Sequence, residues 1–156
     1  MQSSGAGQRC ASATSDVAVG VAHQYREPCR ALVAAIREGE LQATTTVEVI
    51  QEFTHVRARR CGRADAVDLA TDYVELLSPL LVVEEEDLRE GLRRFAASDR
   101  LGSFDAVLAA AARAAGADAL VSADAAFSSV STITHVIPDH DGVRHLLGPA
   151  GDQPPD

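Results

Sequence analysis

Lysine is absent from this 156-residue chain, because all 14 of its basic residues are arginine. Chemistry that needs a lysine amine, such as a P-loop phosphate contact or a Schiff base, is therefore excluded. Tryptophan is also absent and aromatic residues make up only 4% of the chain, so we expect a core of Ala, Val, Leu and Ile. No apolar run approaches the ~20 residues of a membrane helix, and we expect neither a membrane span nor a signal peptide.

Cysteine is scarce, and its spacing carries no metal or redox signature. Cys10, Cys29 and Cys61 are far apart and form no CxxC pair, so a zinc knuckle or a redox dithiol is not expected. A reduced, cytoplasmic location fits this usage best. The net charge of -9 argues against a general nucleic-acid coat protein. It still allows an enzyme that meets nucleic acid through a local arginine cluster and a metal ion.

The pattern of apolar residues predicts one α/β domain in which strands and helices alternate. We expect a flexible N-terminus over 1–9, a domain over 10–140 and a polar tail over 141–156. Alternation of this kind favours a mainly parallel sheet with helices on its faces, and a site beyond the carboxyl ends of the strands. The expected helices cover about 28–38, 45–61, 63–77, 86–97 and 104–115; the expected strands are Asp16–Ala22, Leu41–Thr44, Leu80–Val83, Leu120–Ser122 and Ile133–Ile137.

Local signals refine three of these elements. Thr45 and Glu48 have the spacing of a capping box for the second helix, and Ser103 is a candidate cap for the fifth. In the fourth helix we expect the apolar stripe of Leu88, Leu92 and Phe95 to face inward. By contrast, residues 10–15 make a poor core strand.

Three carboxylates stand at the edges of regular elements. Asp105 falls in the first turn of the fifth helix, where the helix dipole favours a negative charge. Asp124 follows the strand at Leu120–Ser122, and Glu52 flanks the apolar face of the second helix. Each also has an ordinary interpretation, as a helix-start acid, a turn residue and an exposed helix residue respectively. Taken together, carboxylates at one end of a sheet are what a hard divalent cation needs.

The order of these segments resembles a known family. The segments TTVEVIQEF (45–53), FDAVLAAA (104–111) and LVSADAAF (120–127) look like the second, third and fourth motifs of PIN domains, and are closest to those of VapC-type toxins. The resemblance covers roughly residues 23–140. It implies a PIN-like three-layer sandwich with a mainly parallel central sheet and helices on both faces.

The resemblance also implies an activity and its residues. PIN domains are metal-dependent ribonucleases, and the matching acids here are Glu52, Asp105 and Asp124, which would hold Mg²⁺ or Mn²⁺. The metal would activate a water for attack on an RNA phosphodiester. Ser122, just before the last acid, would orient a ligand or a water. The implied partners are RNA, a cognate VapB-type antitoxin and a second copy of the chain.

The first PIN motif, an apolar strand that ends in Asp, has no counterpart in this sequence. The expected acid falls near Ala11, and the nearest carboxylate is Asp16. Either Asp16 substitutes as a metal ligand, or the first acid is missing. In the second case the chain is a catalytically impaired binding module that sequesters antitoxin or RNA.

Several arginines cluster at the end of the second predicted helix. Arg57 and Arg60 lie at the end of the second helix, with Arg59 and Arg63 beside them. One interpretation is contact with RNA phosphates, which arginine binds in a bidentate way. The other is that these residues only complement the dipole at the C-terminal end of the helix.

Overall fold

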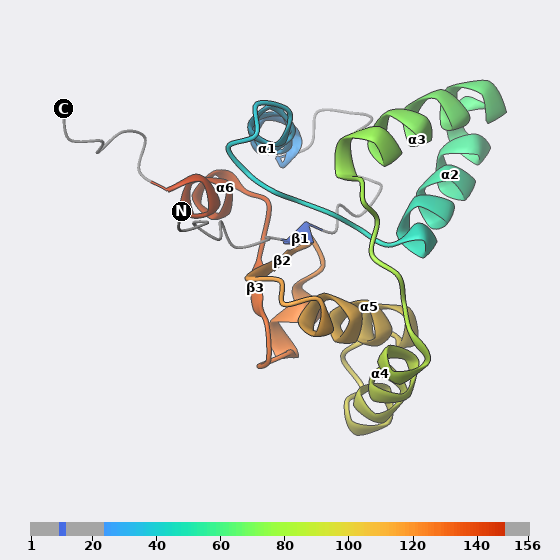
Figure 1. The fold of residues 1–156 in the computed structure, drawn as a ribbon, viewed down its shortest axis with the longest axis vertical. Coiled ribbons are helices and arrows are strands. Elements are labelled where there is room, and N and C mark those ends of the chain that lie inside the picture. The colour runs from blue at the N-terminus through green and yellow to red at the C-terminus, as the bar shows by residue number, and fades with distance from the viewer. Residues whose placement is uncertain (1–9, 12–23, 149–156) are drawn as a thin grey trace, which may run out of the picture.

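The computed structural model describes residues 10–11 and 24–148, and its elements form three layers (Figure 1). A small parallel sheet has the strand order β1-β2-β3. Helices α1 and α6 lie on one side of this sheet, and α4 and α5 lie on the other. Helices α2 and α3 pack against each other as a pair beside these layers. The predicted α/β sandwich with a mainly parallel sheet is therefore confirmed.

The bounds of the elements follow the predicted order closely. They are β1 (Cys10–Ala11), α1 (Arg26–Arg37), α2 (Val47–Cys61), α3 (Arg63–Leu77), α4 (Glu85–Ala97), α5 (Ser103–Ala114), β2 (Ala119–Val121), the 3₁₀ helix η1 (Ala125–Ser129), β3 (Thr134–Val136) and α6 (His140–Leu147). The five predicted helices and the last two predicted strands are present. The segments expected as strands near residues 41–44 and 80–83 contribute only a single parallel bridge, between Thr46 and Leu81.

Strand β2 separates two hydrophobic clusters, because its side chains alternate between the two faces of the sheet. Leu120 packs with the apolar face of α5, which is rich in small residues such as Ala106, Ala109 and Ala112. Ala119 and Val121 pack on the opposite side with residues of α1 and α6. The small side chains bring α5 close to the sheet, and this fixes the position of the first turn of α5.

Four local expectations need correction. Thr46, not Thr45, caps α2, and its hydroxyl accepts a hydrogen bond from the Val49 N–H. The cap of α5 is Gly102, so Ser103 is already helical. The predicted polar tail is wrong for residues 141–147, because Val143 and Leu146 of α6 are buried against the sheet.

The fourth correction concerns α4, whose apolar stripe does not face the core. Leu88, Leu92 and Phe95 are 45%, 49% and 47% exposed. The face that packs on α5 is centred on Gly91 instead, where an added Cβ would lie 2.6 Å from the Val107 Cα. A side chain at position 91 would therefore force the two helices apart, and the close approach turns the apolar stripe outward.

The N-terminal strand is only partly described. Cys10 and Ala11 form β1 and pair with Leu120 and Val121, so the interpretation of residues 10–15 as a poor core strand is wrong for these two positions. The strand predicted over Asp16–Ala22 lies outside the described residues. Among the helices that the structure describes, none is long and apolar enough to cross a membrane.

Candidate active site

Asp105 occupies the first turn of α5 and is partly buried. Its helix is anchored by buried alanines, which hold the turn against the sheet. Gly102 lies directly beside the carboxylate, since a Cβ at position 102 would stand 3.3 Å from Asp105 Oδ2. The glycine therefore leaves open space next to the Asp105 oxygen, where a ligand can approach.

Asp124 follows β2 and is held by its neighbours. Its Oδ1 accepts a 2.8 Å hydrogen bond from the Ala126 N–H, which caps the short helix η1. Its own N–H donates to the Ser122 Oγ at 3.1 Å. Ser122 is only 1% exposed, so this contact anchors an exposed carboxylate to the buried end of the strand.

Glu52 lies in α2 next to the buried Phe53 and is exposed to solvent. Burial raises the pKa of Asp105, and the negative charges of Asp124 and Glu52 raise it further. Asp124, at the end of β2, and Glu52, in α2, are thus both close enough to repel the negative charge of Asp105 in α5. Repulsion of this kind is relieved by a cation.

His135 supports the site from β3, although no sequence pattern indicates this role. Its Nε2 lies 2.9 Å from the Ser122 carbonyl oxygen, and its Nδ1 lies 2.8 Å from the Ser128 Oγ. A ring that donates from Nε2 to the carbonyl oxygen and accepts at Nδ1 from the Ser128 hydroxyl satisfies both contacts. Because this contact crosses between two strands, no spacing along the chain reveals it. His135 thereby helps to fix the segment that carries Asp124.

The donor chemistry of this site fits a hard divalent cation. None of the three carboxylates forms an ion pair within the described part of the chain. Oxygen ligands with uncompensated negative charge suit Mg²⁺ or Mn²⁺. Within residues 24–148, however, no three or more His, Cys, Asp or Glu side chains stand close enough to hold one ion together. A metal would therefore draw the carboxylates closer or take ligands beyond the described residues.

The two predicted arginines are not part of this acid group. Arg57 forms an ion pair with Asp65 of α3, which raises the pKa of Arg57 and lowers that of Asp65. Arg60 is exposed at the end of α2. Asp16, the candidate fourth ligand, lies outside the described residues.

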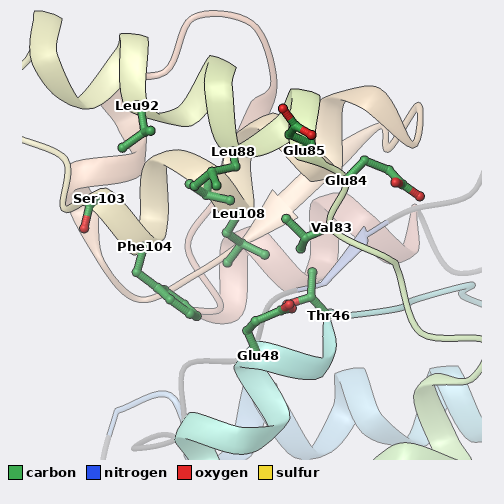
Figure 2. A pocket seen from close by; sticks show the side chains of 11 residues that line it. Thr46, Glu48, Val83, Glu84, Glu85, Leu88, Leu92, Ser103, Phe104 and Leu108 are labelled. Atoms are coloured by element: carbon green, nitrogen blue, oxygen red, sulfur yellow. The ribbon is translucent and has the colours of Figure 1, made fainter.

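A cavity of about 570 Å³ opens beside the start of α5 (Figure 2). Leu88 and Leu92 of α4 and Phe104 of α5 border it on one side, and Thr46 and Glu48 from the start of α2 border it on the other. Most of its walls are apolar, so it provides a surface for an apolar group rather than for an ion. The cavity continues the exposed stripe of α4.

Proteins with a parallel α/β sheet form a class that binds ligands beyond the carboxyl ends of the strands, which is where Asp124 lies. The family model that matches residues 16–133 is the PIN domain. The chain is also 50% identical over 135 residues to Ribonuclease VapC7 of Mycobacterium tuberculosis (strain ATCC 25618 / H37Rv). The aligned segment covers 84% of this chain and 91% of that protein. No solved structure matches the chain. The chain belongs to the PIN domain family and is of the VapC type.

Proposed function

We propose that this protein is a metal-dependent endoribonuclease and the toxin component of a type II toxin–antitoxin pair. The observation that carries the proposal is the electrostatic coupling of Asp105 with Asp124 and Glu52. A carboxylate whose negative form is disfavoured by burial and by two further negative charges gains stability from a dication beside it. The identity to a protein named as a ribonuclease supports RNA as the substrate.

Each residue of the candidate site has a distinct role in this proposal. Asp105 and Asp124, with Glu52, would hold Mg²⁺ or Mn²⁺. When bound, the metal supplies a water of lowered pKa for in-line attack on a phosphodiester and stabilises the departing oxygen. Ser122 and His135 fix the segment that presents Asp124. Gly102 keeps space open beside the Asp105 oxygen.

The test of this function is RNA cleavage by the purified chain with Mg²⁺, with Mn²⁺ or with EDTA. We expect cleavage only with metal, and its loss by 100-fold or more in Asp105→Asn, a typical order of magnitude for a group that acts in the transition state. Asp99→Asn, at an exposed acid just beyond α4, makes the same charge change as a matched control. Full cleavage by Asp105→Asn would refute the proposal.

The proposal includes two protein partners, a VapB-type antitoxin and a second copy of the chain, and a cytoplasmic location where toxin and RNA meet. The stripe of Leu88, Leu92 and Phe95 supports the dimer. Exposed apolar residues at i, i+4 and i+7 form a continuous helix face that gains stability when another helix covers it. Around a two-fold axis the stripe would pack against itself.

The oligomeric state tests the dimer. We expect Leu88→Glu with Leu92→Glu to sediment as a monomer, because charges in an apolar interface oppose its burial. Val67→Glu, at an exposed apolar position of α3, serves as the matched control and should leave the dimer intact. A monomeric parent chain at micromolar concentration would contradict this part of the proposal.

A second candidate function is a binding module without catalysis. The observation that favours it is β1, where Cys10 and Ala11 supply no carboxylate near the strand end at which PIN domains place their first acid. Such a module would bind RNA or antitoxin and cleave nothing. A Mn²⁺ titration decides between the two, since the module predicts no saturable binding and no cleavage at any metal concentration.

A further inference from the structure

A row of arginines follows one face of α1, away from the acidic site. Arg26, Arg30 and Arg37 are spaced four and seven residues apart, which places them within about 40° of one another around the helix axis. The row is about 16 Å long. All three residues line a groove of about 360 Å³, whose far wall includes Tyr73 of α3.

The charge of this groove is the opposite of that of the whole chain. Arg30 pairs with Glu27, but neither Arg26 nor Arg37 has an ion pair within the described residues. Of the residues that line the groove, Glu38 is the acidic one. The groove therefore carries a net positive charge, although the protein as a whole carries -9.

The groove also contains a sulfur that does not reduce this charge. Burial raises the pKa of the Cys29 thiol to about 11, so Cys29 is neutral at pH 7. The Tyr73 hydroxyl is neutral as well, because burial raises its pKa by more than Arg37 and Arg57 lower it. The same electrostatic effect shows that Arg37 of α1 and Arg57 of α2 both lie near the Tyr73 hydroxyl.

Tyr73 links this groove to the acidic site. Its ring packs edge-on against Phe53, with the two ring centroids 5.2 Å apart. Glu52, whose negative charge acts on Asp105, directly precedes Phe53 in α2. Phe53 is buried and offers no surface to a ligand, but it alone separates Tyr73 on the groove wall from the residue Glu52.

We propose that the arginine groove of α1 binds the phosphodiester backbone of single-stranded RNA that flanks the cleavage site. The proposal rests on the proposed ribonuclease function for the identity of the polymer. Arginine guanidinium groups match phosphate geometry and supply bidentate hydrogen bonds. The short separation between Tyr73 and Glu52 favours RNA over an acidic protein segment, because one strand of RNA is long enough to reach both.

Binding of RNA without cleavage tests this proposal. The full chain in EDTA is titrated into a fluorescein-labelled single strand of about 15 nucleotides, and anisotropy gives the Kd at several salt concentrations. The test variant is Arg26→Ala with Arg37→Ala. The matched control is Arg89→Ala with Arg113→Ala, which removes the same charge from exposed positions on α4 and α5.

The expected result is quantitative. Each phosphate contact to a single strand contributes about 0.7 to the slope of log Kd against log salt, so losing two contacts should lower the slope by about 1.4. At 0.1 M salt this corresponds to roughly 25-fold weaker binding. The control variant should retain the slope of the parent chain. With Mg²⁺ present, the groove variant should raise KM for this RNA and leave kcat unchanged.

Several outcomes would overturn the proposal. Equal slopes for the groove variant and the parent chain would do so, as would a loss of binding to an oligoglutamate peptide with no change for RNA. Circular dichroism and thermal unfolding show whether the groove variant retains its fold, and Arg26→Gln with Arg37→Gln provides a second route if it does not. If the parent chain binds RNA but cleaves none, the ribonuclease proposal fails. The difference in salt slope between the groove variant and the parent chain still tests the groove proposal.

Discussion

Replacing Ser122 by alanine removes one hydroxyl group and isolates a single contact at the candidate site. The Ser122 Oγ accepts a 3.1 Å hydrogen bond from the Asp124 N–H, and the side chain is 1% exposed. The backbone contacts of Ser122, to the Val136 carbonyl and to His135 Nε2, do not involve the hydroxyl. Alanine also fits the space, because it only deletes the oxygen.

The size of the effect follows from this geometry. A net intramolecular hydrogen bond contributes about 0.5–1.5 kcal/mol. Asp124 is exposed, so water replaces part of the lost contact, and we expect the free energy of unfolding to fall by about 1 kcal/mol. For a domain of this size that corresponds to a Tm lower by roughly 2–4 °C. Freeing Asp124 should also weaken metal affinity by about 10-fold or more, the usual effect of losing a contact that orients a ligand.

Urea denaturation and a Mn²⁺ titration measure the two effects separately. The control is Ser129→Ala, since the Ser129 Oγ donates to the Ala126 carbonyl at 2.7 Å and makes no contact with Asp124. We expect the control to retain the parent chain's Mn²⁺ half-saturation. If Ser122→Ala binds Mn²⁺ as tightly as Ser129→Ala, then Ser122 does not position Asp124 and the reasoning is wrong.

Three further predictions concern metal, pH and packing. Mg²⁺ at a hundredfold excess over its Kd should stabilise the chain by ~2.7 kcal/mol, EDTA should reverse this, and Asp105→Asn should show neither effect in thermal unfolding. Arg57 holds the pKa of Asp65 below its ordinary value, so the stabilisation from this pair is present above about pH 4 and lost as the pH falls through the lowered pKa. Asp65→Asn should therefore lower the Tm at pH 7 and leave it unchanged in strong acid, as calorimetry can check. Gly91→Ala should destabilise the chain by about 1–3 kcal/mol in urea, because the added Cβ meets Val107 backbone at 2.6 Å; the gain of about 1 kcal/mol in helix propensity offsets only part of this cost. A Gly91→Ala chain as stable as the parent would show that α4 and α5 separate at little cost.

Helix starts show how far local sequence can predict structure here. The α2 helix begins one residue later than the capping pattern at Thr45 predicts, because Thr45 lies buried beside the bridge to Leu81 and Thr46 takes the cap. The fold class could be predicted without the exact helix starts, because the order of strands and helices was sufficient. The long-range pairing that decides the cap leaves no mark on the local pattern.

The apolar stripe of α4 shows where periodicity fails. Spacing identifies a helix with one apolar face, and that part of the prediction is confirmed. It cannot say which face meets α5, because that depends on how closely the helices approach at Gly91. The helix α6 was mistaken for a polar tail for a similar reason. Val143 and Leu146 are too few to give an apolar pattern in the sequence, and they become buried only because α1 packs beside them.

For the candidate site, local patterns are enough to predict the carboxylates of Glu52, Asp105 and Asp124 as ligands and to predict the parallel α/β order. Each acid is marked locally, by a helix start, a strand end or a motif. That Asp124 and Glu52 act on Asp105 follows from the three-dimensional fold, because the interaction between charges depends on their distance in space and not along the chain. The fold also decided that His135 supports Ser122, since contacts between strands have no fixed sequence spacing.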